Sequence, residues 1–183
     1  MGFHYRIYDN EKAYFITITV VEWVELFIRR NHSTAVVESL EYCIKNKGLE
    51  LFAWCLMPNH LHMIARGKEG HLLSNIVRDF KRHTSKKLAD QITNEPESRR
   101  RRLIETFRDA ALTHPKEIKL KIWQDGYHPV ELYSRGFTKQ KLNYIHQNPV
   151  EQLLVEHPWD YLFSSARDYA GKKGMLDVVL LEM

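Results

Sequence analysis

The chain has 183 residues, a formal net charge of +4 at pH 7 and 27% charged residues. This length is enough for one domain with its own hydrophobic core, and we expect a single domain over residues 1–183. No apolar run approaches the roughly 20 residues needed to span a bilayer, so we expect no membrane partner. Cys43 and Cys55 lack C-x-x-C spacing, which favours two reduced cysteines in a cytoplasmic protein over a disulfide framework.

The first half of the chain alternates between strand and helix patterns. β-branched and aromatic residues predict strands, apolar residues at helical spacing predict helices, and Gly48 is a stop signal for the first helix. The expected elements in order are a strand at 13–21, a helix at 32–48, a strand at 49–57, a strand from His60 and a long helix at 72–92. The two adjacent strands are so close in sequence that they predict an antiparallel hairpin.

A polar segment divides the two halves of the chain. From Thr93 to Lys121 the pattern is broken by Pro96 and Pro115. We expect residues 93–121 to be an insertion or a mobile segment, with helical pieces and a mobile tip around 97–102.

The second half predicts one short strand and two helices. Residues 122–133 indicate a loop that leads into a short strand. A helix is expected over 138–150, with Thr138 as its N-cap and Pro149 enforcing its end. A last short helix has capping-box spacing at Ser165 and Asp168. The order of these elements predicts an α+β domain, with helices on one face of an antiparallel sheet.

The segment MPNHLHMIARG, residues 57–67, brings two histidines into an otherwise apolar strand. Because successive side chains of a strand point to opposite faces, His60, His62 and Ile64 share one face. One interpretation is a half-exposed strand with two solvated histidines. The other is a pair of metal ligands, since neutral imidazole is a common ligand of metals. The H-x-H spacing alone does not decide between them.

Three polar residues share one face of the helix expected over 138–150, namely Lys141, Tyr144 and Asn148. An amphipathic surface would explain this stripe taken alone. Beside the histidine pair, however, Asn148 can add an oxygen ligand to a cation held by two imidazoles, leaving positions for a phosphate oxygen. Tyr144 can then act as a nucleophile, helped by Lys141 or by the metal-bound phosphate.

Positive charge is concentrated in one stretch. Between Arg78 and Arg102 nine Lys and Arg residues stand against four acids, a net +5. Such a stretch suits a polyanionic partner, although a solvated helix face explains it equally well. The residues expected to contact DNA are Arg78, Lys81, Arg82, Lys86, Lys87 and Lys141.

Three motifs in order carry a resemblance to a known family. They are MPNHLHMI at 57–64, YIHQNPV at 144–150, and a tryptophan separated by four residues from Ser-Ser, at 159–165. Together they resemble the single-tyrosine transposases of the HUH class (His, hydrophobic, His), and in particular the REP-associated tyrosine transposases. The resemblance extends over most of the chain and rests on the ordered set, because H-x-H alone is a weak motif.

The resemblance implies a fold, a metal and a reaction. The fold is a ferredoxin-like antiparallel sheet with His60 and His62 on a central strand, plus C-terminal helical additions. The cofactor is a divalent metal, Mg²⁺ or Mn²⁺, bound by both histidines with Asn148 as third ligand, and the nucleophile is Tyr144. Members of the family cut single-stranded DNA, often beside a hairpin, leaving a 5′-phosphotyrosine link and a free 3′-OH.

Two functional readings remain open at this stage. The first is a metal-dependent endonuclease and strand transferase acting on hairpin-bearing single-stranded DNA. The alternative is a domesticated, non-catalytic protein of the same fold that binds structured DNA or RNA. A structural zinc site fits poorly, because no cysteines accompany the two histidines. The sequence leaves both a homodimer and a monomer open.

Overall fold

The computed structural model describes residues 7, 9–112 and 118–182. Its strands are β1 (Tyr14–Thr19), β2 (Leu49–Leu56), β3 (His60–Gly67) and β4 (Val130–Glu131). Its α-helices are α1 (Arg30–Asn46), α2 (Leu73–Asn94), α3 (Arg100–Leu112), α4 (Arg135–Glu151) and α5 (Ala166–Tyr169). Short 3-10 turns occur at Val21–Trp23, Leu26–Ile28 and Pro158–Asp160.

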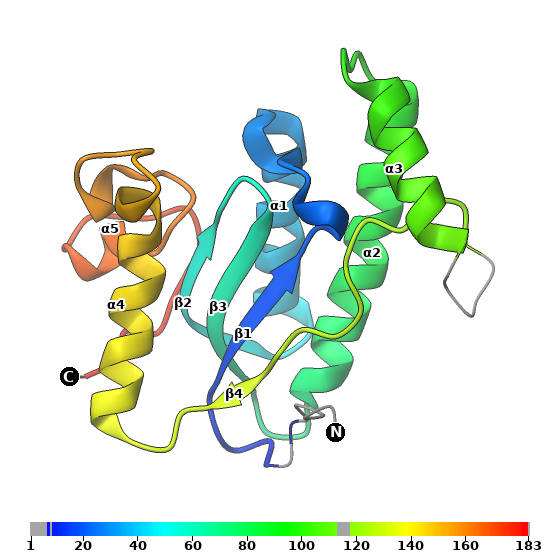
Figure 1. The fold of residues 1–183 in the computed structure, drawn as a ribbon. Helices are drawn as coiled ribbons and strands as arrows, with labels where there is room; N and C mark the ends of the chain where they lie inside the picture. Colours follow the sequence, from blue (N-terminus) through cyan, green and yellow to red (C-terminus); the bar gives the residue numbers. More distant parts are fainter. Residues whose placement is uncertain (1–6, 8, 113–117, 183) are drawn as a thin grey trace, which may run out of the picture.

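The four strands form one antiparallel sheet in the order β2-β3-β1-β4. This order, with α1 between β1 and β2 and α2 after β3, is the ferredoxin-like arrangement, so the expected α+β fold is confirmed. The expected hairpin is also present, because β2 pairs directly with β3. Helices α1 and α2 lie on one face of the sheet, and α4, a C-terminal addition, covers the other (Figure 1).

Strand alternation divides the interior into two cores. Ile16 and Ile18 of β1 and Leu61 and Met63 of β3 belong to the larger core, beneath α1 and α2. The intervening residues point the other way, where Phe15 and Ile64 pack with Leu142 and Ile145 of α4. The histidines of β3 have the same parity as Ile64 and therefore lie on the face that α4 covers.

Other segments cover both outer edges of the sheet. Beside β1, Thr17 N–H donates to the Tyr127 carbonyl at 3.1 Å, and β4 continues the pairing. Beside β2, Leu56 N–H donates to the Phe163 carbonyl at 2.8 Å and Val179 N–H to the Leu51 carbonyl at 2.9 Å. These contacts occupy the backbone groups through which an exposed edge strand would pair with a second copy.

The segment from Thr93 to Lys121 contains real structure. Helix α2 extends to Asn94, α3 follows from Arg100, and Leu103 and Phe107 of α3 are buried in the larger core. A mobile tip was expected around 97–102, but there the Glu97 carboxylate is enclosed between Arg29 and Arg99. Ion pairs that sequence patterns do not reveal therefore hold this part of the segment against the rest of the domain.

Three details of the expected helix ends are wrong. Helix α4 begins earlier, because Ser134 rather than Thr138 caps it, with Ser134 Oγ accepting from Phe137 N–H at 3.2 Å. Pro149 lies inside the last turn of α4, which continues to Glu151. Ser165 makes no capping hydrogen bond to α5.

The two cysteines are buried and free, as expected. Burial raises the pKa of the Cys43 thiol to about 11 and also raises the pKa of Cys55, so both thiols stay protonated at neutral pH. No helix in the described ranges is long and apolar enough to span a membrane.

A buried cluster joins α4 to the edge strand β2. His146 Nε2 lies 2.9 Å from Ser165 Oγ, which also accepts from Trp54 N–H at 3.0 Å. Burial lowers the pKa of His146 to about 4. The uncharged imidazole is thus the form that the folded protein holds at neutral pH.

This burial predicts an acid-sensitive fold. A histidine whose pKa falls from about 6.5 in the unfolded chain to about 4 on folding contributes stability above pH 6.5 that is lost as the pH falls towards 4. The expected contribution of His146 to this loss is about 3 kcal/mol. Urea unfolding between pH 7.5 and 4 should show that His146→Gln has a correspondingly shallower pH dependence. Parallel curves for the two proteins would contradict the assignment.

Candidate active site

The two histidines of β3 lie side by side and are nearly enclosed. His60 is 6% and His62 4% exposed, and their ring centroids are 4.4 Å apart. His62 Nδ1 lies 2.9 Å from Thr17 Oγ1, and His60 Nδ1 lies 2.6 Å from Asn59 Oδ1. Both Nδ1 atoms are thus engaged, and His62 Nε2 is buried without a hydrogen-bond partner in the described residues. This arrangement suits imidazoles that present Nε2 to a metal.

Burial keeps both rings uncharged. It lowers the pKa of His60 to about 4. It also lowers the pKa of His62 to about 3, with smaller contributions from His60 and from the positive charge of Lys141. Both histidines are therefore neutral near pH 7, the form that binds a metal without first releasing a proton. The reading of two solvated histidines on a half-exposed strand is wrong.

Tyr144 of α4 lies against the histidine pair of its own chain. Its ring centroid is 5.2 Å from that of His62 and 5.9 Å from that of Phe15. The side chain remains 42% exposed, so a substrate can reach it. Leu142 and Ile145, buried on either side of it in sequence, attach α4 to the sheet.

Lys141 adds a positive charge at the same place. Its Nζ lies 4.7 Å from the ring centroid of Phe15 and 5.7 Å from that of Tyr144. An ammonium over aromatic faces is attracted by the ring electrons and keeps its charge near the tyrosine. The sequence-predicted pair Lys141 and Tyr144 is thus brought together beside His62.

Asn148 lies one turn further along α4 and is buried. Its Oδ1 accepts a hydrogen bond from Gln152 Nε2 at 3.3 Å. In the described part of the chain, no three His, Cys, Asp or Glu side chains are placed so that together they could hold a metal ion. A third protein ligand beside His60 and His62 would therefore be a residue of another type, such as this amide, and that role for Asn148 stays a prediction.

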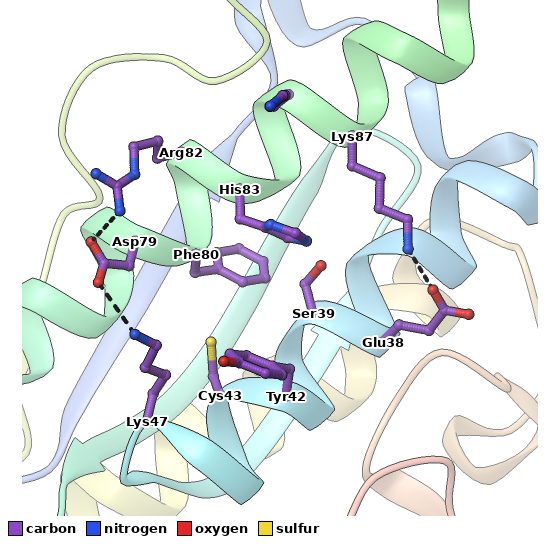
Figure 2. Close-up of a pocket in the computed structure, with 11 residues that line it drawn as sticks. Glu38, Ser39, Tyr42, Cys43, Lys47, Asp79, Phe80, Arg82, His83 and Lys87 are labelled. Carbon is purple, nitrogen blue, oxygen red and sulfur yellow. Dashed lines mark hydrogen bonds and ion pairs between the residues drawn. The ribbon is translucent and has the colours of Figure 1, made fainter.

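The expected DNA-binding residues divide between the two faces of the sheet. Lys141 lies on the face of the histidines, whereas the basic residues of α2 lie across the sheet, beside α1 (Figure 1). Side chains of α1 and α2 line a cleft (Figure 2), whose volume is about 700 Å³. Arg82, Lys86 and Lys87 line it, with Arg82 3.4 Å from Asp79 and Lys87 2.5 Å from Glu38. Arg78, also exposed, shares Asp79.

Lys81 is engaged inside the protein and is not suited to DNA contact. Its Nζ donates to the carbonyl oxygens of Gln124 at 2.8 Å and Gly126 at 2.5 Å. Burial lowers its pKa to about 8. Lys81 therefore stabilises the segment beside β1 and does not belong with the expected DNA-binding residues. A count of charges along a helix cannot separate such a lysine from its exposed neighbours.

Sequence reasoning missed three residues around the histidines. Thr17 and Asn59 hold the two imidazoles, and Trp23 lies edge-on to His60 with ring centroids 6.0 Å apart. The pairing of the first strand with the third would have identified Thr17, had their register been known. No local pattern marks Trp23, because it lies in an irregular turn after β1.

Comparison with known protein families gives a match to "Transposase IS200 like" over residues 12–107, which is more than half of the chain. The chain belongs to the IS200-like transposase family. The match contains both histidines, the strands that hold them and α2. A search of curated proteins finds no match.

A search of solved structures gives matches to two transposases. One is a REP-associated tyrosine transposase bound to a REP hairpin, 17% identical, with a TM-score of 0.65 over 100% of this chain and 95% of that one. Another is a putative transposase from Deinococcus radiodurans R1, 16% identical, with a TM-score of 0.45 over 79% of this chain and 94% of that one. At such identities the first match supports the shared fold of the whole chain.

The hydrogen bond between Thr17 Oγ1 and His62 Nδ1 predicts a role for Thr17 in metal affinity. Thr17→Val keeps the shape of the side chain but removes the hydroxyl that orients the imidazole. We expect Mn²⁺ to bind about 10 to 100 times more weakly, as is usual when a partner of a ligating histidine is lost. Calorimetric titration of Mn²⁺ measures this effect.

Thr19→Val is the matched control. Thr19 pairs with His60 across the same two strands, but the His60 ring donates its hydrogen bond to Asn59 Oδ1. This variant should therefore keep the wild-type affinity for Mn²⁺. Equal affinities for the two variants would argue against the orienting role of Thr17.

Proposed function

We propose that this protein is a metal-dependent endonuclease and strand transferase that cuts single-stranded DNA beside a hairpin and retains the 5′ end on Tyr144. The observation that carries the proposal is the 5.2 Å separation of the Tyr144 and His62 rings within one chain. Tyr144, two neutral imidazoles and the Lys141 ammonium meet there on one face of the sheet.

The proposed reaction exchanges one phosphoester bond for another. The Tyr144 oxygen forms a bond to phosphorus, and the bond from phosphorus to the 3′ oxygen breaks, which gives a 5′-phosphotyrosine and a free 3′-OH. Because the number of phosphoester bonds is unchanged, the step is reversible and the released or another 3′-OH can reseal it. The positive charge of Lys141, close to the Tyr144 ring, stabilises the negative charge of the phosphate that is attacked.

The residues present fit a divalent metal. Two neutral imidazoles with oriented rings, one of them with a buried Nε2 that has no described partner, form a suitable nitrogen pair. Asn148 would supply an oxygen, and this mixed set suits Mg²⁺ less well than Mn²⁺. Bound there, the metal would polarise a phosphate oxygen as a Lewis acid.

One chain is proposed to form a complete site. Tyr144 contacts His62 of its own chain, so no exchange of α4 between two copies is needed. The covered edges of the sheet also favour a monomer, because they leave few free backbone N–H and C=O groups for pairing with a second copy. We therefore propose that a monomer is competent for cleavage.

The basic surface of α2 is proposed to bind the hairpin itself. It lies across the sheet from the histidines, so a strand cannot contact both α2 and Tyr144 without passing around the sheet. A duplex stem against Arg78, Arg82, Lys86 and Lys87 would leave its single-stranded flank free to reach the other face, where Lys141 lies. The hairpin bound by the 17% identical relative supports this choice of partner.

Tyr144→Phe should abolish covalent capture of DNA and leave binding nearly unchanged. The substitution removes only the hydroxyl, while affinity in such complexes comes mainly from phosphate contacts. The measurement is a denaturing gel of labelled hairpin DNA with a single-stranded flank, incubated with Mn²⁺ or Mg²⁺. An adduct that survives denaturation is expected for the wild-type protein and not for the variant.

Two further variants sharpen this test. His60→Ala and His62→Ala should each remove the adduct while Tyr144 is intact, because the site then loses a nitrogen ligand. An adduct formed by Tyr144→Phe would refute the choice of nucleophile. Tight hairpin binding by the wild-type protein without any adduct would support a non-catalytic, domesticated binding protein instead.

The exposed charges of α2 predict a salt-dependent affinity for hairpin DNA. Neutralising two phosphate contacts with Arg82→Gln and Lys86→Gln should reduce the slope of log affinity against log salt by about 1.4 to 1.8, depending on whether the contacts are to single-stranded or duplex DNA. The loss should be similar for unrelated stem sequences, because phosphate contacts position DNA without reading its bases. Fluorescence anisotropy at several salt concentrations measures the slope.

Lys172→Gln with Lys173→Gln is the charge-matched control. These exposed lysines follow α5, which lies beside α4 rather than α2 (Figure 1). The control removes the same net charge and should leave the slope near that of the wild-type protein. Identical slopes for the two double variants would show that the DNA does not follow α2.

A further inference from the structure

Trp23 is an exposed aromatic residue beside the histidine pair. Its side chain is 58% exposed, yet its ring lies edge-on to His60 with 6.0 Å between centroids. An indole used only to cover His60 would bury most of its surface. Here one edge of the residue faces the site and the larger part of its surface remains available to solvent.

The backbone at Trp23 adopts a conformation that bulky residues avoid. Trp23 and the preceding Glu22 both have φ of 53°, in the left-handed region that glycine favours. Outside glycine and asparagine such values are uncommon, and for a bulky residue they mark strain that the surrounding structure must maintain. Two consecutive residues of this kind turn the chain sharply and direct the indole outward.

Hydrogen bonds on both sides hold this turn in place. Asn59 Nδ2 donates to the Trp23 carbonyl at 3.3 Å, while Trp23 N–H donates to the Val20 carbonyl at 3.1 Å. Val20 N–H donates to the Asn59 carbonyl at 2.9 Å, and Val21 N–H to the Ile122 carbonyl at 2.9 Å. The turn is therefore attached to Asn59, which directly precedes β3, and to the segment beside β1.

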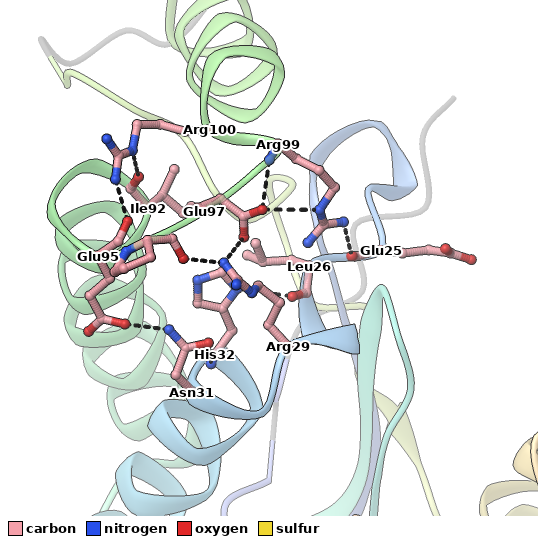
Figure 3. A network of polar contacts seen from close by, with 11 residues as sticks. Glu25, Leu26, Arg29, Asn31, His32, Ile92, Glu95, Glu97, Arg99 and Arg100 are labelled. Atoms are coloured by element: carbon pink, nitrogen blue, oxygen red, sulfur yellow. Dashed lines mark hydrogen bonds and ion pairs between the residues drawn. The ribbon is translucent and has the colours of Figure 1, made fainter.

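The residues after Trp23 are held by contacts with Glu97 and Arg99, which directly precede α3. Arg99 donates to the Glu25 carbonyl at 2.9 Å, and Glu97 pairs with both Arg99 and Arg29 (Figure 3). Leu26 is fully buried, and α3 packs beside Val21–Trp23. Glu97, Arg99 and α3 thus have a structural role, since they support the turn that presents Trp23.

We propose that Trp23 is a stacking platform for a base of the single strand that enters the active site, within one or two nucleotides of the phosphate attacked by Tyr144. The inference rests on the proposed cleavage of single-stranded DNA. An exposed indole beside a phosphate-binding centre could pack against one of two partners, a nucleic acid base or an apolar protein surface. Its distance from His60 favours the base, because the strand bound at the histidines must pass beside this ring.

Stacking at this point would position the strand for cleavage. Phosphate contacts alone let a strand slide, because successive phosphates are alike. A base held on a rigid aromatic ring fixes which phosphate lies opposite Tyr144. Every base offers a π face, so the platform selects single-stranded over duplex DNA more than one sequence over another.

The test combines protein variants with abasic DNA. Tyr144→Phe serves as the background, so that binding is measured without cleavage, and the DNA is a hairpin whose single-stranded flank carries one abasic site at successive positions. In this background one abasic position should weaken binding by about five- to a hundredfold. Adding Trp23→Ala should reduce the penalty at that position to less than about twofold, while Trp23→Phe should retain most of it.

Tyr42→Ala in the same background is the matched control. Tyr42 is 56% exposed but lies on α1, on the other face of the sheet. It should leave the abasic penalty unchanged. Quenching of Trp23 fluorescence by the oligonucleotide, measured in a Trp159→Phe background, should accompany binding and be lost with Trp23→Phe.

The outcomes separate this inference from the proposed function. An abasic penalty that is the same with and without Trp23 would overturn the stacking role, even if the wild-type protein forms its covalent adduct. Absence of any binding to the single-stranded flank would overturn both. A Trp23→Ala variant that melts like wild type, binds Mn²⁺ normally and loses only the abasic penalty supports a direct contact with DNA.

Discussion

The pairing of β1 with β3 determines where every candidate active-site residue lies. In this register Thr17 is opposite His62, and Phe15 is opposite Ile64 on the face that α4 covers. A shift of one residue would turn the histidines into the core beneath α1 and α2, where their ring nitrogens would lack partners. The register is held by the apolar side chains of the other parity, Ile16 and Ile18 against Leu61 and Met63. The burial of apolar side chains on one face of the sheet thus fixes the positions of the histidines on the other face.

The same constraint explains why α4 is needed. A two-layer ferredoxin-like domain covers one face of its sheet, and β3 would then expose two histidines to solvent. Leu142 and Ile145 attach α4 to the second face, and the residues between and beside them, Lys141 and Tyr144, remain at the border between core and solvent. Because both imidazoles are nearly enclosed on this face, the pKa values of His60 and His62 fall and both rings stay neutral.

The periodicity of the sequence predicted which residues share a face of a strand or a helix, because this depends only on neighbours in sequence. The shared face of His60 and His62 follows from strand alternation, and the shared face of Lys141 and Tyr144 follows from helical spacing. Periodicity could not predict contacts between distant segments. The Ser165 hydroxyl hydrogen-bonds to β2 and to His146 instead of capping a helix. Lys81 donates to the carbonyl oxygens of Gln124 and Gly126. The position of α2 across the sheet from the histidines also depends on topology, which a count of charges along the chain does not reveal.

Asn59 shows why an amide is required at the start of β3. Its Oδ1 accepts from the His60 ring at Nδ1, which leaves Nε2 of His60 as the atom with a free lone pair. Its Nδ2 donates to the Trp23 carbonyl, which holds the strained turn beside the same histidine. An aspartate could accept from His60 but could not donate to Trp23, and its charge would favour a protonated imidazole. One side chain with both a donor and an acceptor therefore links the proposed metal-binding atom of His60 with the proposed stacking ring of Trp23.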